Sequence, residues 1–432
     1  MLKDTWQKAF VNFKTYAYLR KFNKESLLPA EEVGRIQFTR LKTLLCDVYQ
    51  THPFYRERFK ASQFDPFKMD DLSDYRKVPI LEKDDYRTFI KSQLEQNERR
   101  YRNWYKNGTS GSTGMPLRIM RTWDERAYMS AKWMRVLYLN GYNWRDVTFS
   151  LPHPHRVKRD SFVQRFGILQ RYTVAYDAPV ENMIEMYVKV RPSFVYANKT
   201  HLVIMALYCE QNKIELPKPH LCISVAETMD ERSKAVIENC FGAENLIEAY
   251  GAIEFGIIAW QKKGEDFFNF CHTTNYLEVH DENGQETNFG RCIITDLYIR
   301  SFPLIRYNLG DVLVTETKNG LPVIKKIRGR QDDWIIFADG ERMPFHTFYG
   351  IMERRHEIKQ FRVTQENYYK ICIQVVKESE ADKSALENSL LTDLRLEVRD
   401  KDIEYIIDFV DNIPQDPNGK IRMLISKIKQ IG

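Results

Sequence analysis

Gly108-Thr109-Ser110-Gly111-Ser112-Thr113-Gly114, followed by Met115-Pro116, is the stretch that says most about the fold of this chain. A loop so rich in glycine and hydroxyls can wrap backbone N–H groups around a phosphate, while its hydroxyls bond the phosphate oxygens. It matches neither the Walker pattern, since no Lys follows the glycines, nor the dinucleotide spacing Gly-x-Gly-x-x-Gly. A flexible linker has a similar composition, but residues 101–106 and 117–120 favour a tight strand–loop–strand unit. The loop therefore indicates triphosphate chemistry of an unusual kind.

The bulk composition is that of a soluble globular protein. The 432 residues are 43% hydrophobic and 29% charged, enough for about two or three domains with a large core. We expect a cytoplasmic protein without a membrane span, because no apolar run approaches the roughly 20 residues that a span needs and no signal peptide is evident. The net charge of +6 is spread along the chain, which predicts no nucleic-acid partner and suits an anionic substrate such as a nucleotide.

The cysteines give only weak metal signals. Seven are scattered along the chain and none forms a Cys-x-x-Cys pair, so neither a zinc knuckle nor a redox dithiol is indicated. Residues 153–155, His-Pro-His, and the pair Cys271-His272 are the spots where a metal could be suspected. Whether Cys271, His272 and Cys292 together bind a metal stays open at this point.

Residues 1–330 predict a large α/β domain with mixed sheets and flanking helices. The first 100 residues are helical in pattern, with an amphipathic helix over residues 31–50, and a further helix is expected over residues 124–139. Strand-like and helix-like segments then alternate from residue 193 to residue 250, which predicts a mixed or parallel sheet covered by helices. Residues 270–315 are β-rich, with a hairpin turn at Asn283-Gly284.

The sequence changes character near residues 329–332. The rest of the chain predicts strands at 361–364, 369–376 and 404–409 and a helix at 384–395. We therefore expect a small, mobile α+β domain over residues 331–432, hinged on the large domain.

Six separated fragments occur in a telling order. They are Thr109-Ser110-Gly111-Ser112-Thr113-Gly114, Ser224-Val225-Ala226-Glu227, Tyr250-Gly251-Ala252-Ile253-Glu254, Arg306-Tyr307-Asn308-Leu309-Gly310-Asp311, Gly329-Arg330-Gln331-Asp332-Asp333 and Asn418-Gly419-Lys420-Ile421-Arg422. In this order they resemble the core motifs of the adenylate-forming superfamily, the acyl-CoA synthetases and their relatives. Two further segments, His52-Pro53-Phe54-Tyr55-Arg56 and residues 302–307, are similar to segments of the phenylacetate–CoA ligase family, particularly its CapK-like branch. The resemblance as a whole covers nearly the whole chain.

The resemblance implies a set of site residues. It implies catalytic roles for Lys420, Glu254 and Arg306, with Glu254 also the ligand of Mg²⁺. The implied nucleotide-binding residues are Thr109, Ser110, Gly111, Ser112, Thr113, Gly114, Ala226, Glu227, Ala249, Tyr250, Gly251, Asp311 and Arg330.

The chemistry of these residue types fits an adenylating enzyme. The hydroxyl loop suits the β- and γ-phosphates, Tyr250 offers a flat face for adenine, and Gly251 allows close backbone approach. Glu254 is a hard oxygen ligand, and Asp311 can accept two hydrogen bonds from ribose hydroxyls. Lys420 can bridge the substrate carboxylate and the α-phosphate.

Each of these residues also has a plainer structural interpretation. Tyr250-Gly251 could form an ordinary turn, Asp311 could cap its own backbone, and Lys420 could be a solvated surface residue. The shared order of the fragments favours the functional interpretation.

The resemblance implies two half-reactions. ATP and a carboxylic acid give an acyl-adenylate and pyrophosphate; the small domain then swings about Asp332, and a thiol such as coenzyme A attacks the acyl carbon. A carrier protein, or a sugar or cofactor hydroxyl, is an alternative acceptor, and an inactive nucleotide-binding scaffold in polysaccharide assembly is an alternative of another class. A homodimer is compatible with the family.

Two departures from the family pattern qualify these expectations. Leu117 stands where many superfamily members carry a Lys, which shifts phosphate binding to backbone N–H groups, Mg²⁺ and Arg118 or Arg121. Residues 150–155 differ from the Gly- and aromatic-rich segment of the phenylacetate enzymes, so the acid is not predicted.

Overall fold

The chain folds into two units that interleave along the sequence. The computed structural model describes residues 2–96, 98–108, 118–152, 164, 166–281, 283–330, 334–339, 341–345, 348, 351–352, 355, 357–398, 402–414 and 421–428. The first unit comprises Met1–Gly141 and Ala249–Ile327, and the second comprises Tyr142–Glu248 and Arg328–Gly432. None of the described helices is long and apolar enough to cross a bilayer.

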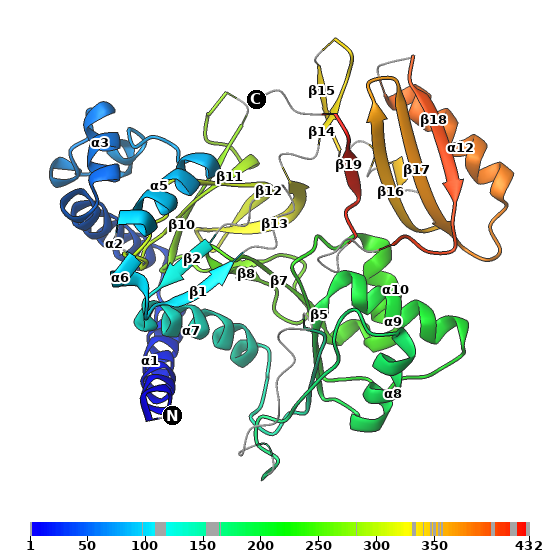
Figure 1. Cartoon of the computed structure of the whole chain (residues 1–432), viewed down its shortest axis with the longest axis horizontal. Helices are drawn as coiled ribbons and strands as arrows, with labels where there is room; N and C mark the ends of the chain where they lie inside the picture. The colour runs from blue at the N-terminus through cyan, green and yellow to red at the C-terminus, as the bar shows by residue number, and fades with distance from the viewer. Residues whose placement is uncertain are drawn as a thin grey trace. The chain divides into compact units, whose positions relative to one another are not determined.

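Helices build the N-terminal part of the first unit (Figure 1, blue). They are α1 (Leu2–Glu25), α2 (Ala30–Thr51), α3 (Pro53–Ala61), α4 (Leu72–Tyr75), α5 (Lys83–Gln96) and α6 (Glu98–Tyr101), with a 3-10 turn η1 (Pro66–Lys68). The predicted amphipathic helix is confirmed as α2, which buries Leu41, Leu44, Leu45 and Val48 at helical spacing. The predicted helix over residues 124–139 is confirmed as α7 (Trp123–Leu139), which begins at a capping box of Thr122 and Glu125.

The strands of the first unit carry most of the predicted site. β1 (Tyr105–Gly108) and β2 (Arg118–Arg121) pair antiparallel, with Gly108 opposite Arg118, so the hydroxyl loop joins two paired strands as predicted. The first strand begins later than expected, because residues up to Tyr101 belong to α6. A four-stranded sheet contains β10 (Asn275–His280), β11 (Phe289–Asp296), β12 (Tyr307–Lys318) and β13 (Leu321–Arg330) in that order.

One apolar core joins the helices of the first unit to this sheet. Leu44 and Tyr55 from the helices belong to the same buried cluster as Ile294 and Tyr307 from the strands. β8 (Gly256–Trp260) pairs antiparallel with the end of β7 (Leu246–Ala252) and with β9 (Asn269–Phe270). The predicted hairpin at Asn283-Gly284 is confirmed between β10 and β11, where Gly284 has a φ of +77°.

The second unit contains the parallel strands of the sheet that was expected to be mixed or parallel, and the sheet as a whole is mixed. β4 (Arg171–Thr173), β3 (Thr148–Ser150), β5 (Phe194–Asn198) and β6 (Leu221–Val225) lie in that order, and all their pairings are parallel. The helices α8 (Val180–Val190), α9 (Lys199–Gln211) and α10 (Glu231–Phe241) alternate with the strands (Figure 1, green), followed by a 3-10 turn η4 (Ala243–Asn245). The alternation expected from residue 193 onward is confirmed.

The C-terminal part of the second unit is α+β, as predicted. Its four-stranded sheet has the order β18 (Glu404–Phe409), β17 (Lys370–Lys377), β16 (Ile358–Asn367) and β19 (Leu424–Ser426). Leu386, Leu390 and Leu394 of α12 (Lys383–Glu397) pack into its core. A short hairpin of β14 (Trp334–Ile336) and β15 (Arg342–Pro344) precedes it. The predicted domain boundary at residues 330 and 331 stays a prediction.

Candidate functional site

Two predicted nucleotide-binding side chains contact each other in the first unit. The hydroxyl of Tyr250, near the end of β7, donates a hydrogen bond of 2.6 Å to Oδ2 of Asp311 on β12. Both side chains are half-buried. Asp311 follows Gly310, whose φ of +83° bends the strand in a region that favours glycine. The structure thus brings the expected adenine contact and the expected ribose contact to one place.

Gly251 is required by the backbone of the hairpin itself. A Cβ atom at this position would lie 2.3 Å from the carbonyl oxygen of Gly256, far inside van der Waals contact. The pairing of β7 with β8 also shifts register between Tyr250 and Gly251, and such a bulge re-aims the neighbouring side chain. The group that lies close to Gly251 is therefore the Gly256 carbonyl of the same hairpin. The close approach of a nucleotide to Gly251 stays a prediction. Ala249, two residues earlier, is buried opposite Trp260.

Glu254 lies next to the strand that leaves the hydroxyl loop. Its backbone carbonyl accepts a hydrogen bond from Nη2 of Arg121, the last residue of β2. Glu254 is 6% exposed and Arg121 is 3% exposed. Within the described residues the Glu254 carboxylate has no hydrogen-bond or ion-pair partner, and Nη1 of Arg121 is buried without one.

These two groups fit the predicted cofactor and substrate. Buried charged groups in proteins are normally paired or bind a metal, so a buried carboxylate without a partner suits a divalent cation with oxygen ligands. A buried guanidinium nitrogen without a partner suits a phosphate oxygen. Of the two arginines considered after the loop, the structure describes the side chain of Arg121, and it is adjacent to Glu254.

Glu227 caps a helix in the second unit. Its Oε2 atom accepts hydrogen bonds from the backbone N–H of Thr200, at 2.8 Å, and from the Thr200 hydroxyl, at 2.7 Å. These contacts satisfy one of the free N–H groups at the start of α9. The Oε1 atom is buried without a partner. Ala226 before it has a φ of +66°, which is costly for a residue with a side chain.

A buried group of charges near Glu227 was missed by sequence reasoning. Lys199 forms a 3.0 Å ion pair with Asp230. Burial lowers the pKa of Lys199, but the carboxylates of Asp230 and Glu227 outweigh it and leave that pKa raised. Burial raises the pKa of Glu248, on β7, to about 7. Lys199 lies on α9, Glu227 and Asp230 lie in the loop before α10, and Glu248 lies on β7, so no regular spacing in the sequence predicts the group.

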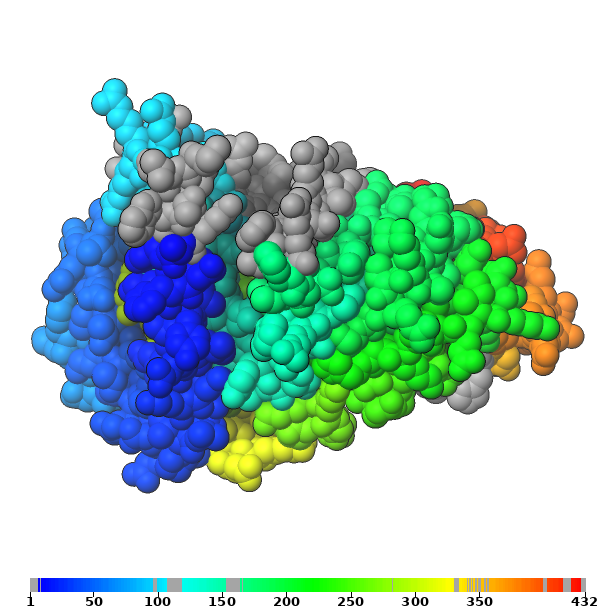
Figure 2. Space-filling view, turned by 90° about the horizontal axis from the view of Figure 1, so that it is seen from below, coloured from blue at the N-terminus to red at the C-terminus, as the bar shows by residue number. Residues whose placement is uncertain are grey.

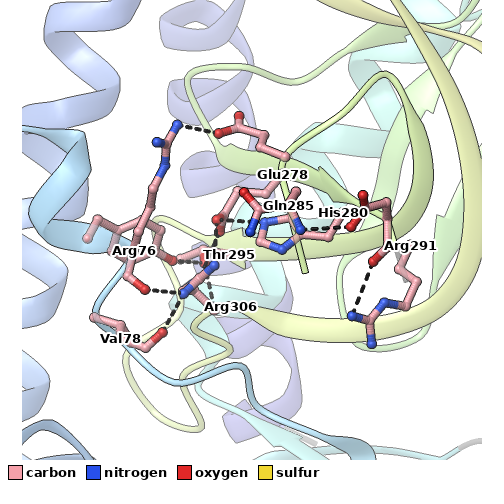
Figure 3. Close-up of polar contacts among 11 residues, drawn as sticks. Arg76, Val78, Glu278, His280, Gln285, Arg291, Thr295 and Arg306 are labelled. Carbon is pink, nitrogen blue, oxygen red and sulfur yellow. Dashed lines mark hydrogen bonds and ion pairs between the residues drawn. The ribbon is translucent and has the colours of Figure 1, made fainter. Parts of the chain in front are cut away.

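The guanidinium of Arg306 forms hydrogen bonds with other residues of the chain (Figure 3). Its Nε and Nη2 atoms pair with both oxygens of Glu278, at 3.1 and 2.8 Å, and Nη1 donates to the carbonyls of Arg76 and Val78. Four of the five N–H groups of the guanidinium are thereby used. The residue is 5% exposed and has a φ of +47°.

These contacts favour a positioning role for Arg306. They fasten residues 76–78 beside β12, the strand that carries Asp311 five residues later. Arg306 also lines an open pocket of about 770 Å³ together with Arg76, His280 and Glu286. A catalytic role for Arg306 would have to be exercised there and stays a prediction.

Several predicted site residues lie outside the described residues. They are Thr109, Ser110, Gly111, Ser112, Thr113 and Gly114 of the loop, Lys420, Asp332 at the expected hinge, and the His-Pro-His segment at 153–155. Arg330 ends β13, but its side chain is not described.

The suspected metal residues take other contacts. Cys271 is 1% exposed and lies 4.0 Å from Nη1 of Arg135. Burial and the charge of Arg135 lower the pKa of His272 to about 4. Burial raises the pKa of the Cys292 thiol well above its usual value. In the described part of the chain, no three His, Cys, Asp or Glu side chains are grouped so that they could hold a metal ion.

Known proteins resemble this chain along most of its length. Residues 338–427 match the family model of the CapK C-terminal domain. Protein CapK of Staphylococcus aureus is 24% identical over 446 aligned positions, covering 96% of this chain and 95% of the relative. These matches confirm the predicted resemblance to the CapK and phenylacetate–CoA ligase family.

More distant relatives agree with the fold. The phenylacetate-coenzyme A ligase of Aromatoleum evansii is 21% identical and covers 73% of this chain and 74% of its own. The crystal structure of a 2-hydroxyisobutyryl-CoA ligase, in the postadenylation state with 2-HIB-AMP, superposes with a TM-score of 0.73 at 18% identity, covering 93% of this chain and 90% of that chain. The fold is that of the adenylate-forming CoA ligases.

Proposed function

We propose that this protein activates a carboxylic acid with ATP and transfers the acyl group to a thiol, in the first instance that of coenzyme A. The hydrogen bond between Tyr250 and Asp311 carries most weight, because it joins the two side chains that the family pattern assigns to adenine and ribose. Glu254 and Arg121 add a cation ligand and a phosphate contact in the same unit. The resemblance to CoA ligases supports the same chemistry.

In the first half-reaction an oxygen of the substrate carboxylate attacks the α-phosphorus of ATP. The bond from the α-phosphorus to the bridging oxygen breaks, and pyrophosphate leaves with that oxygen. Asp311 orients the nucleotide through its ribose, and Arg121 and the hydroxyl loop hold the β- and γ-phosphates. Glu254 would hold Mg²⁺, which would supply neutralisation of the charge on the phosphates.

In the second half-reaction the thiolate attacks the acyl carbon and AMP leaves. Lys420 acts in the first half-reaction and matters much less in the second, because the small domain turns about Asp332 between them. Arg330 and Glu227 help to position the nucleotide. The identity of the acid does not follow from the relatives, since the match to the phenylacetate enzyme is only 21% identical.

ATP–pyrophosphate exchange over a panel of aryl, fatty, hydroxy and amino acids tests the first half-reaction. At least one acid should support Mg²⁺-dependent exchange, which Asp311→Asn should reduce and the exposed Glu181→Gln should not. ATP binding without exchange on any acid would leave the protein a nucleotide-binding scaffold and refute the proposal.

The acceptor is tested separately with the best acid. Release of AMP that depends on coenzyme A supports thioester formation. If exchange proceeds normally but no thioester forms from coenzyme A, the acceptor is instead a carrier protein or a sugar or cofactor hydroxyl.

A further inference from the structure

The N-terminal helix α1 has two aromatic faces, and only one of them is covered. Phe22 is fully buried, with its ring 5.8 Å from that of Tyr128 and 5.6 Å from that of Tyr298. Tyr18 packs beside it and donates a 2.6 Å hydrogen bond to Asp124 on α7. These contacts fix which face of the helix points inward.

The opposite face presents large apolar side chains to solvent. Phe10 is 43% exposed, Phe13 is 71% exposed and Tyr16 is 60% exposed. Their spacing of three residues places them along one side of the helix. Leu27, just beyond the end of α1, is 86% exposed. Figure 2 shows α1, in the darkest blue, on the surface of the first unit.

Positive charge is concentrated on the same helix. Residues 2–25 contain six Lys or Arg and two Asp or Glu, a net of +4 out of +6 for the whole chain. Arg20, Lys21 and Lys24 are exposed, and Arg20 and Lys24 continue the side that carries Phe13. The expectation that the charge is spread along the chain is therefore wrong for this segment.

We propose that α1 docks the protein on an anionic phospholipid surface. Exposed aromatics among Lys and Arg are typical of helices that lie in a membrane interface, where rings enter the headgroup region and cations meet the lipid phosphates. The helix would lie on the bilayer and not cross it, in keeping with its low hydrophobicity. A second copy of the chain is a poorer occupant, because pairing α1 with itself would bring together two helices of net charge +4.

Sedimentation with vesicles tests the proposal on the full chain. We expect binding to phosphatidylcholine vesicles that contain phosphatidylglycerol, weaker binding at high salt because surface charges are screened, and little binding to phosphatidylcholine alone. Equal binding to both vesicles, or to neither, would overturn the proposal.

Paired variants separate the helix from general stickiness. The triple variant Phe10→Ser, Phe13→Ser, Tyr16→Ser should lose vesicle binding. The matched variant Phe67→Ser, Phe289→Ser, Tyr369→Ser removes side chains that are 51%, 48% and 56% exposed elsewhere, and it should keep binding. Unchanged melting temperatures establish that both fold. If both triple variants bind alike, α1 is not the docking surface.

Charge is tested in the same way. Arg20→Gln with Lys24→Gln should weaken binding about thirtyfold, since each cation near such a surface contributes roughly a factor of five. The exposed pair Lys60→Gln with Lys91→Gln should change it little. Two further outcomes contradict the proposal: an oligonucleotide that binds α1 more tightly than the vesicles do, or a dimer in sedimentation velocity that the aromatic triple variant dissociates.

Discussion

The hydroxyl of Tyr250 donates to Oδ2 of Asp311 across 2.6 Å, although the two residues are 61 positions apart in the chain. A charged acceptor makes this one of the stronger kinds of side-chain hydrogen bond. The phenol and the carboxylate thus position each other in the folded protein, which would lower the entropic cost of ordering them around the proposed nucleotide.

Loss of this bond should weaken ATP binding. We expect Tyr250→Phe to raise the KM for ATP about tenfold in pyrophosphate exchange, because a hydrogen bond to a charged group contributes about 1.5–3 kcal/mol. Asp311→Asn should have a larger effect, since it also removes the predicted ribose acceptor. Tyr369→Phe, at an exposed position, is the control. Equal kinetics for all three variants would contradict the assignment.

Glu254→Gln should abolish exchange without lowering stability. The carboxylate has no hydrogen-bond or ion-pair partner among the described residues, so the substitution breaks no described polar contact and removes a buried charge, and the free energy of unfolding should not fall. The measurement is exchange as a function of Mg²⁺ concentration, together with urea unfolding of the same sample. A variant with a normal Mg²⁺ dependence would show that Glu254 is not the metal ligand.

Arg121→Met should raise the KM for ATP more than it lowers exchange at saturation. It removes both the contact to the Glu254 carbonyl and the unpartnered Nη1 atom. Arg121→Lys keeps the charge with a single donor group and should recover only part of the activity. If Arg121→Met destabilises the protein but binds ATP normally, its role is to hold the Glu254 turn alone.

Arg306→Met should lower the free energy of unfolding, and any loss of activity should follow from that loss of stability. Glu278 would lose its buried ion pair with Arg306 and keep only a 3.2 Å contact to His280, a loss of up to about 3–5 kcal/mol. The double variant Arg306→Met, Glu278→Leu should recover part of that loss, because no charge is then stranded. Urea unfolding measures both. A single variant that is stable but inactive would instead favour a catalytic role.

Glu248 predicts a specific dependence of stability on pH. Burial raises its pKa from 4.5 to about 7 in the folded protein, so the folded state holds a proton that the unfolded state releases. Stability should therefore fall as pH rises from 4.5 to 7 and then level off, by up to about 3 kcal/mol. Glu248→Gln should remove this dependence, and the exposed Glu181→Gln should keep it. Identical pH profiles for the two variants would count against a perturbed Glu248.

Local patterns were enough to predict much of the fold. The sequence predicts a helix over residues 124–139 that stops near Asn140-Gly141, and α7 ends at Leu139. The alternation from β5 to α10 followed from strand and helix periods in the same way. Hydrophobic periodicity and the residues that end an element are properties of short segments, so they can be recognised in the sequence.

The contacts that build the site could not be predicted in this way. Arg121 meets Glu254 across 133 positions, and Arg306 meets Val78 across 228. Such pairs have no characteristic spacing in the sequence, because the folding of the intervening sheets and helices brings the two residues into contact. The motif alone predicts a catalytic role for Arg306, and it carries no sign of the Glu278 carboxylate and the backbone carbonyls that the guanidinium contacts in the structure.

The closeness of Gly251 to the Gly256 carbonyl has a consequence for engineering. Mutant libraries designed to alter the proposed acid specificity would randomise the loop after Tyr250. Any side chain at position 251 must push the hairpin apart, and Gly256, with a φ of +64°, resists replacement as well. Substitutions are better introduced at Ala252 and Ile253, with both glycines kept, so that most variants in the library still fold and changes in specificity can be detected.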